Sequence, residues 1–424
     1  MKPTVSMRSI TGWLLWLFVF TVPWDVVAIE GIGALSRLIG VALLGTALLT
    51  TAIEGKFRKP TAIFAVASAY IAFTALSLLW TISYPDTVQI VLTGVQILGS
   101  MWVVAEFTRT REQLQSLLVA FCLGELIPLA GIFNSFRTGN RLMFSERYTA
   151  IGLNADDIGL TLAMGIPIAW HLIRTYSGSL RRTVRAAGLI YFVLAPVAIL
   201  LTGTRGATIT GVVALSIVPL TLPWRSIRSV VLIAVMLVAI GATATIVVPQ
   251  RMWARILTIK QELLEGGSMT GRAGIWQTGV DLIPEHPMFG VGASAFGAAV
   301  EPILNKRQAP HNLLLGLVVE LGIVGFSIYA ALLGACGMAI SRMPPPERKL
   351  WAVLMLCWLV GVMSLNWEYR KVTWLLFGFV AAQGAADNAR RRMSASPAPV
   401  GDAAIELRSL QPVYLRSADQ RAIR

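Results

Sequence analysis

His311 stands where a polar segment meets a long apolar run, and its type and place suit proton transfer. The unperturbed pKa of histidine, about 6.5, leaves the imidazole largely neutral at physiological pH, as a general base requires. Asn312 follows it and could orient the ring. Pro310, His311 and Asn312 also fit the start and N-cap of a helix, and their spacing alone favours neither interpretation.

Arg205 and Arg272 are candidates for holding phosphate oxygens, because a guanidinium offers a fixed charge and a two-pronged donor. Arg205 lies in TGTRGA, where glycines on either side interrupt the helix. An arginine there is costly in lipid, so it faces a cavity or else snorkels to the headgroups. Arg272 lies four residues before Trp276, so the two share one helical face. The indole could pack on a ligand or on a neighbouring helix.

Other polar residues are weaker candidates. Arg147 and Asn154 lie in the polar stretch RYTAIGLNADD, whose two aspartates fit a helix cap. Arg37, buried early in the apolar run 32–53, is either an anion contact or a snorkelling residue. His286, in EHP before a glycine turn, fits a plain loop, and His171 fits a packing or interfacial role.

The composition indicates a polytopic membrane protein. Of 424 residues, 55% are hydrophobic and 14% charged, which leaves too little polar surface for a soluble domain of this length. The net charge of +14 comes from basic residues in short loops and the tail, so it predicts topology, not nucleic-acid binding. The first apolar run lacks a small-residue cleavage site and is expected to remain as a span. The three cysteines lie inside apolar runs without metal-ligand spacing.

Twelve transmembrane helices are expected from apolar runs of about 20 residues with charged or turn residues at their ends. The runs cover 10–27, 32–53, 61–80, 87–107, 114–133, a sixth ending near 174, 187–201, an eighth leaving toward 224, 230–248, 311–340, an eleventh ending near 367 and a twelfth after 371. The flanking charges place both termini in the cytoplasm.

This topology divides the chain into four parts. Residues 1–248 hold spans one to nine, 249–310 form a far-side loop with short helices, 311–389 hold spans ten to twelve, and 390–424 form a cytoplasmic tail. Within the far-side loop, RMWARILTIKQELL has an apolar helical side and is expected to lie flat on the membrane.

The far-side loop and span ten together resemble the O-antigen ligase and polymerase superfamily of bacterial envelope glycosyltransferases. The residues that carry the resemblance are Arg272, Trp276, His286-Pro287, Gly290-Val291-Gly292 and His311-Asn312, followed by Gly322 and Gly325. An arginine in the position of Arg205 also fits, and Arg147 and Asn154 loosely match a further family segment. The resemblance implies an all-helical, GT-C-like fold.

The resemblance further implies transfer of a glycan from an undecaprenyl-diphosphate carrier to lipid A-core. His311 would deprotonate the acceptor, Arg205 and Arg272 would hold the leaving diphosphate, and Asn312 could hydrogen-bond sugar hydroxyls. Asp25 or Glu30, on the first far-side loop, is an alternative base. The chain has no D-x-D triplet, so we expect no nucleotide, metal or other cofactor. We expect direct displacement with inversion, in a bacterial inner membrane with the active site facing the periplasm.

Three other functions remain open. A polysaccharide polymerase and a protein O-oligosaccharyltransferase belong to the same superfamily. Polymerases usually divide their catalytic arginines between two large far-side loops, so the single large loop 249–310 favours a ligase. A lipid or solute transporter could also use an arginine-lined cavity, but it would not need His311 as a base.

Overall fold

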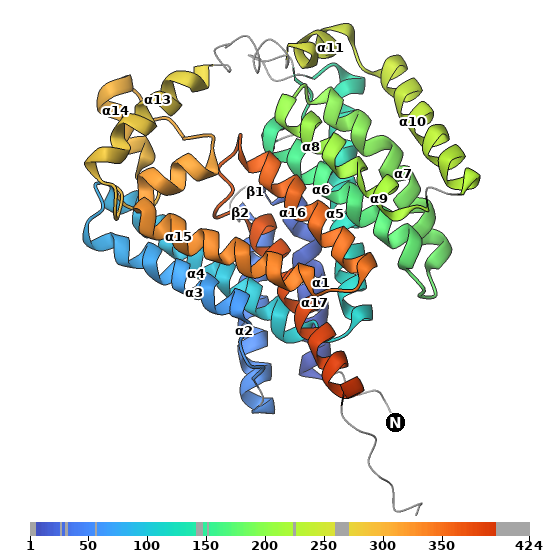
Figure 1. The fold of residues 1–424 in the computed structure, drawn as a ribbon, viewed down its shortest axis with the longest axis horizontal. Helices are drawn as coiled ribbons and strands as arrows, with labels where there is room; N and C mark the ends of the chain where they lie inside the picture. The colour runs from blue at the N-terminus through green and yellow to red at the C-terminus, as the bar shows by residue number, and fades with distance from the viewer. Residues whose placement is uncertain are drawn as a thin grey trace, which may run out of the picture.

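The fold was analysed in a computed structural model of the chain (Figure 1). The structure describes residues 6–25, 28–29, 33–55, 57–140, 147–150, 152–223, 226–258 and 271–395. Within these residues the regular structure is helical except for two antiparallel two-residue strands, β1 (Ala28–Ile29) and β2 (Gly33–Ala34). The expected all-helical architecture is therefore confirmed for this part of the chain.

Eight helices among the described residues are long and apolar enough to cross a membrane. They are α2 (Leu35–Glu54), α3 (Ala62–Leu76, continued by η2, Ser77–Leu79), α4 (Tyr84–Phe107), α5 (Arg111–Thr138), α6 (Ala155–Thr175), α7 (Arg181–Leu201), α10 (Ile227–Val247) and α15 (Leu313–Ser341). These helices establish a polytopic membrane protein, and each coincides with an apolar run expected from the sequence.

The remaining helices are shorter or more polar. They are α1 (Met7–Thr21), η1 (Val22–Trp24), α8 (Arg205–Leu215), α9 (Ile217–Thr221), α11 (Gln250–Leu257), α13 (Arg272–Leu282), η4 (Ile283–Glu285), α14 (Phe296–Leu304), α16 (Pro345–Val362) and α17 (Lys371–Ala395). Four of the twelve expected spans correspond to α1, the pair α8 and α9, α16 and α17. The apolar stretch formed by α8 and α9 is short.

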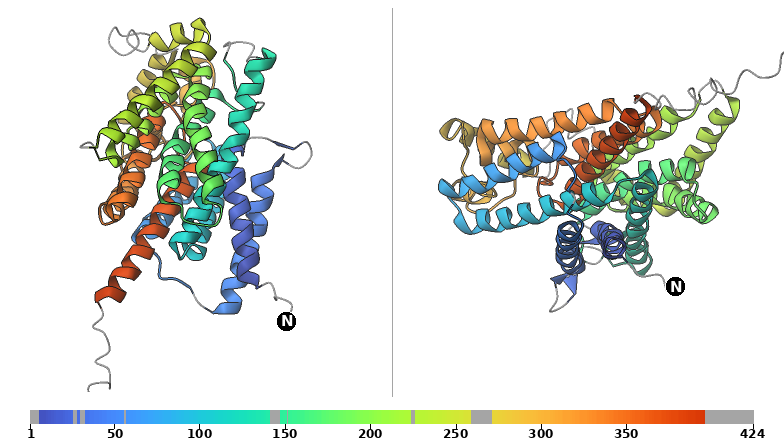
Figure 2. Two further views of the ribbon diagram at one scale, coloured as in Figure 1. Left: turned by 90° about the vertical axis from the view of Figure 1, so that its right-hand side faces the viewer. Right: turned by 90° about the horizontal axis from the view of Figure 1, so that it is seen from below.

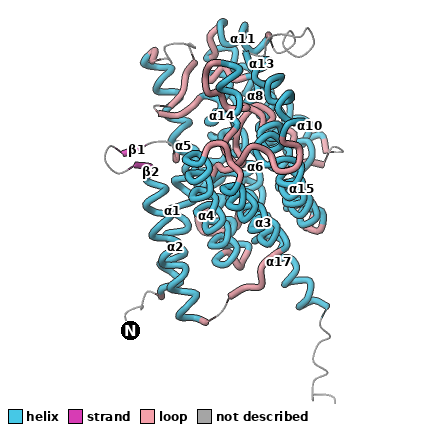
Figure 3. The backbone as a smooth tube through the Cα atoms, turned by 90° about the vertical axis from the view of Figure 1, so that its left-hand side faces the viewer, coloured by secondary structure: helices cyan, strands magenta, loops and turns pink. Residues whose placement is uncertain are grey.

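The helices form two groups that meet along the middle of the molecule (Figure 1). One group contains α3, α4, α15 and α17, and the other contains α5 to α10 with α16. Helix α1 packs on α2 and α5 and also contacts α4. The start of α1 and the end of α17 lie at one end, and α11 and α13 lie at the other (Figures 2 and 3). We call the end with α11 and α13 the loop end.

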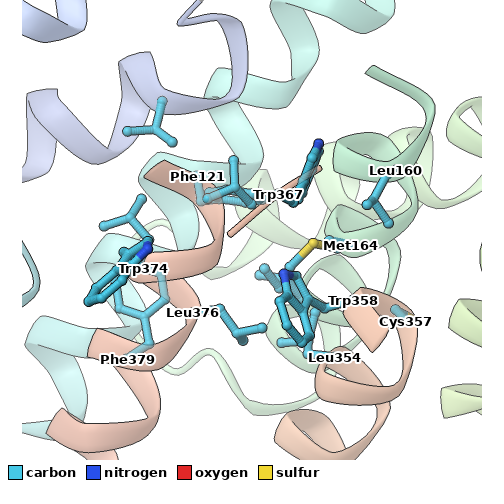
Figure 4. Close-up of a cluster of buried hydrophobic side chains, with 14 of the residues drawn as sticks. Phe121, Leu160, Met164, Leu354, Cys357, Trp358, Trp367, Trp374, Leu376 and Phe379 are labelled. Carbon is cyan, nitrogen blue, oxygen red and sulfur yellow. The ribbon is translucent and has the colours of Figure 1, made fainter. Parts of the chain in front are cut away.

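Buried tryptophans fix the connection between α16 and α17. The side chains of Trp358, Trp367 and Trp374 lie in the apolar core between the two groups (Figure 4). Trp374 Nε1 donates to the carbonyl oxygen of Glu368 at 2.7 Å, and Trp358 Nε1 donates to Thr373 Oγ1 at 2.9 Å. Because each buried indole N–H needs a partner, these bonds hold the residues between the two helices in one position.

Helix α15 is broken at Gly322, where the backbone adopts φ 63°. The loop after η4 supplies partners for the backbone groups beside the break: Ile323 N donates to Pro287 O at 2.9 Å, and Gly292 N donates to Glu320 O at 2.9 Å. A Cβ on Gly290 would lie 2.4 Å from the backbone of Glu320. The loop around Gly290 and the break at Gly322 therefore interlock. The span expected for 311–340 is present as α15, with a break that was not expected at Gly322.

Candidate active site

Asp156, in the first turn of α6, lies between two arginines from distant parts of the chain. Arg147 Nη1 approaches Asp156 Oδ1 at 3.1 Å, and Arg272 Nη2 approaches Asp156 Oδ2 at 3.5 Å. The helix itself is capped by Asn154, whose Oδ1 accepts from the Asp156 backbone N–H at 2.8 Å. Arg272 Nη1 also donates to the carbonyl oxygen of Ser364 at 3.2 Å. Asp156 thus joins α6 to α13.

Hydrogen bonds made by Arg205 and Arg255 connect the start of α8 to α11. Arg205 Nε and Nη2 donate to Thr258 Oγ1 at 3.0 and 2.6 Å, and Arg255 Nε donates to Gly203 O at 3.0 Å. Gly203 adopts φ 59°, and a Cβ there would lie 3.0 Å from the Met252 sulfur. Only glycine combines this conformation with so close an approach, so the interruption in TGTRGA lets α11 pack on the start of α8.

Helix α11 rests on the protein and not only on a membrane surface. Its apolar residues Met252 and Ile256 are buried, and the helix packs on α7 and α8, while Leu257 remains exposed. The expectation of a helix lying flat on the membrane is therefore wrong for the buried residues of α11. Its continuation, from 259 to 264, lies outside the described residues.

We call Arg147, Arg205, Arg255 and Arg272 the arginine cluster. Burial lowers the pKa of Arg272, Asp156 raises it, and the charges of Arg147 and Arg205 lower it further. Burial also lowers the pKa of Arg255, again with Arg147 and Arg205 acting in the same direction and Asp156 opposing them. Guanidinium groups stay charged, so the lowered pKa values reflect burial first and neighbouring positive charge second. An anion with several oxygens would relieve that repulsion.

His311 lies beside this cluster in a strained turn. Its φ is 46°, in the left-handed region, which non-glycine residues adopt mainly where surrounding contacts enforce it. Trp276 Nε1 donates to Pro310 O at 2.8 Å and fixes the preceding residue. Asn312 Oδ1 accepts from Leu315 N at 3.1 Å and caps α15. Pro310, His311 and Asn312 thus do begin a capped helix, and the imidazole stands at its start.

The protonation of His311 depends on its neighbours. Burial lowers the pKa of its imidazole, the charge of Arg272 lowers it further, and Asp156 and Asp157 raise it. The net direction is downward, so the ring keeps its neutral form to a lower pH than free histidine does. A neutral ring can accept a proton, and the adjacent positive charge favours its release afterwards.

The other candidates lie outside this arrangement. Arg37 was expected to be buried, but α2 begins at Leu35, so Arg37 falls in its first turn and is exposed. It lines a separate small pocket that also includes Lys371. Asp25 is paired with Lys371 Nζ at 2.6 Å, and Glu30 lies outside the described residues. His286 is exposed in the loop after η4.

The sequence did not assign three residues of the site. It showed Asp156 and Asp157 only as possible caps and Arg255 only as a polar residue of a surface helix. Asp157 accepts from Trp367 Nε1 and from Arg370 Nη2, each at 2.8 Å. The one local signal was the pair of adjacent aspartates after a capping asparagine, since a single cap needs only one such side chain.

Residues 190–330 match the family model described as O-antigen ligase. This part of the chain belongs to the O-antigen ligase/polymerase superfamily. The matched segment contains Arg205, Arg255, Arg272 and His311, whereas Asp156 lies before it. A comparison with curated proteins found no match. Members of this superfamily are ligases and polymerases of the glycosyltransferase type.

Among the described residues, no group of three or more His, Cys, Asp or Glu side chains is placed to hold a metal ion. The three cysteines, Cys122, Cys336 and Cys357, are not paired in disulfides.

Proposed function

We propose that this protein is an O-antigen ligase, which transfers an undecaprenyl-diphosphate-linked polysaccharide to lipid A-core. The observation that supports this most is the arginine cluster beside His311. Arg147 and Arg272 pair with Asp156, and Arg205 and Arg255 lie close enough to interact electrostatically with the other arginines. The cluster therefore suits a diphosphate, whose negative charge grows as it leaves. The O-antigen ligase family match covers most of these residues.

The proposed reaction is one direct displacement. An acceptor hydroxyl oxygen attacks the anomeric carbon of the donor glycan, and its proton passes to a ring nitrogen of His311. The bond from the anomeric carbon to the phosphate oxygen breaks, and its electron pair leaves with the undecaprenyl diphosphate. His311 then returns the proton to water. Attack from the face opposite the leaving group inverts the anomeric configuration.

The arginines take the part that a divalent cation plays in many phosphate-transfer sites. Arg205 and Arg272 bind the diphosphate, assisted by Arg147 and Arg255. Arg205 donates to the neutral hydroxyl of Thr258, and phosphate oxygens would offer its guanidinium group stronger, charge-assisted bonds. Because fixed guanidinium groups supply the charge, the reaction needs no metal, nucleotide or other cofactor.

The proposed setting is a bacterial inner membrane, with twelve spans in a GT-C-like bundle. His311 is next to the loop-end helix α13 through Trp276, while the start of α1 and the end of α17 lie at the other end (Figure 3). This separation supports a periplasmic active site with both termini in the cytoplasm, as the flanking basic residues also predict.

The test uses the purified full-length protein in detergent with undecaprenyl-diphosphate glycan and lipid A-core, with EDTA and without nucleotide. Glycan-lipid conjugate is followed on a gel. We expect conjugate from the wild type and a loss of about 100-fold or more in His311→Ala and in Arg272→Ala, the range for a general base and for a charge-stabilising donor. His286→Ala and Arg137→Ala, both exposed residues, are matched controls that should retain wild-type rates.

The outcomes separate the alternatives. A longer donor glycan without conjugate indicates a polymerase, and conjugate formed only on an added protein acceptor indicates a protein O-oligosaccharyltransferase. Movement of labelled lipid across vesicles, unaffected by His311→Ala, indicates a transporter. Full activity in His311→Ala refutes the assignment of the base even if the ligase reaction itself occurs.

A further inference from the structure

A polar pocket, separate from the arginine cluster, opens beside the turn that carries His311. It has a volume of about 490 Å³. Its wall comes from the start of α4, from the residues before and within α14, and from the connection between α16 and α17. The lining residues that matter here are Asp86, Arg307, Pro310, Glu320, Asn366, Glu368 and Arg370. Pro310 precedes His311 directly, so the pocket adjoins the candidate active site.

Two buried acceptor atoms in this wall have no hydrogen-bond partner among the described residues: Asn366 Oδ1 and Glu368 Oε2. Leaving such atoms unpaired is unfavourable, and more so for a charged group. Burial raises the pKa of Glu368, which reports the same poor solvation of its carboxylate. A ligand with hydrogen-bond donors would satisfy both atoms.

The backbone beside these two side chains is anchored. Trp374 Nε1 holds the backbone carbonyl of Glu368 at 2.7 Å. The next residue, Tyr369, is bound through its hydroxyl to Tyr70 at 3.0 Å and to Thr74 at 3.1 Å. The connection between α16 and α17 is therefore anchored in the core at Glu368 and at Tyr369. An anchored backbone that carries two unpartnered acceptors in the wall of a pocket favours a preorganised site.

The pocket offers acceptor oxygens for hydroxyl groups rather than free positive charge for phosphate. Three carboxyl groups, Asp86, Glu320 and Glu368, line it together with two guanidinium groups, Arg307 and Arg370. Both arginines are already engaged: Arg307 pairs with Asp86 and Glu301, each at 2.9 Å, and Arg370 pairs with Asp157. A diphosphate therefore gains more in the arginine cluster, whereas a neutral polyol can donate to the carboxylate and amide oxygens here.

The connection between α16 and α17 also links the pocket to the cluster. Trp367 and Arg370 bind Asp157, which follows Asp156, while Asn366 and Glu368 line the pocket. We propose that this pocket binds the saccharide of the acceptor, with Asn366 and Glu368 accepting hydrogen bonds from its hydroxyls. That the bound saccharide is the acceptor rests on the proposed ligase function. In an inverting reaction the acceptor approaches from the side away from the diphosphate.

The test measures initial rates with donor and acceptor varied separately, for wild type, Asn366→Ala and Glu368→Gln. Loss of one hydrogen bond to a buried acceptor predicts a rise of about 10-fold or more in the KM for lipid A-core, since about 1.4 kcal/mol is tenfold. The KM for the undecaprenyl-diphosphate donor should stay within about twofold. Asp281→Asn, which removes an exposed carboxylate on α13, is the matched control and should change neither KM.

A binding arm keeps this inference separate from the proposed function. Core oligosaccharide freed from lipid A by mild acid, and free O-chain polysaccharide, are each titrated into the full-length protein in detergent by calorimetry. We expect core oligosaccharide to bind the wild type and to bind both pocket variants at least about 10-fold more weakly. That result supports the saccharide site even if no transfer occurs, in which case only the ligase proposal fails.

Three results overturn the inference. The first is an unchanged acceptor KM in both pocket variants of an active enzyme. The second is a rise in donor KM instead, with O-chain polysaccharide as the weakened ligand, which assigns the pocket to the donor glycan. The third is an inactive wild type that binds neither saccharide.

Discussion

Replacing Gly290 with alanine tests the interlock between the loop after η4 and the break in α15. Gly290 has φ 67°, and a Cβ added there would lie 2.4 Å from the backbone carbon and oxygen of Glu320. Those atoms belong to backbone and cannot rotate aside as a flexible side chain can. Gly290→Ala must therefore separate the loop from α15 or distort both.

The magnitude has two parts. Placing alanine in the left-handed region costs about 1–2 kcal/mol, and forcing a methyl group into a filled space costs about 1–3 kcal/mol more. Gly55, at the end of α2, provides the matched control, because it has φ 61° but no atom within 4 Å of an added Cβ. Gly55→Ala should therefore show only the first part.

Both variants are purified in the same detergent and melted at one scan rate, because unfolding of a membrane protein in micelles is under kinetic control. We expect the apparent Tm to fall further for Gly290→Ala than for Gly55→Ala, together with a loss of transfer activity in Gly290→Ala alone. Equal shifts in the two variants, with activity retained in both, would show that the loop and α15 do not need this close contact.

Three further predictions concern the site and the core. Asp156 raises the pKa of His311, so Asp156→Asn should lower that pKa and move the acidic limb of the pH profile of kcat/KM to lower pH. A limb that stays in place or moves to higher pH would contradict this prediction. Gly203 adopts φ 59°, and a Cβ there would lie 3.0 Å from the Met252 sulfur, so Gly203→Ala should displace α11 and raise the donor KM. An unchanged donor KM would show that Arg255 does not help to bind the donor. Glu125 is fully buried in α5, and neither of its carboxyl oxygens has a partner among the described residues. Glu125→Met should raise the Tm, because it removes a cost of about 1–3 kcal/mol for the unpaired carboxyl group; a lower Tm would mean that the carboxyl group stabilises the fold.

The sequence predicted the apolar helices well, because each must match the thickness of a membrane and end in charged or turn residues. The run expected at 87–107 is α4 (Tyr84–Phe107), and that at 230–248 is α10 (Ile227–Val247). Length and composition act locally, so local inspection finds them. The small N-cap residues were also within reach, since Asn154 and Asn312 bond to groups only two or three residues away.

The break at Gly322 could not be predicted in the same way. Its backbone groups are satisfied by the loop after η4, about 30 residues earlier, and nothing in the apolar run itself indicates that partner. The same holds for Asp156, which meets Arg272 across 116 residues. The sequence identified the arginines that are costly to bury in lipid. Their pairing with Asp156 depends on how the fold brings the start of α6 close to the start of α13.

The contact between the loop around Gly290 and the break at Gly322 helps to position both the saccharide pocket and the turn of His311. The loop after η4 is fixed on α15 at Gly290 and Gly292, and this contact supplies partners to the broken helix next to Glu320, which lines the saccharide pocket. Two turns upstream, the same helix begins at the strained turn of His311, which Trp276 ties to α13 and hence to Arg272. One short stretch of α15 therefore carries the candidate base toward the arginine cluster and a wall of the pocket toward the acceptor, and a displacement of α15 should impair donor and acceptor binding together.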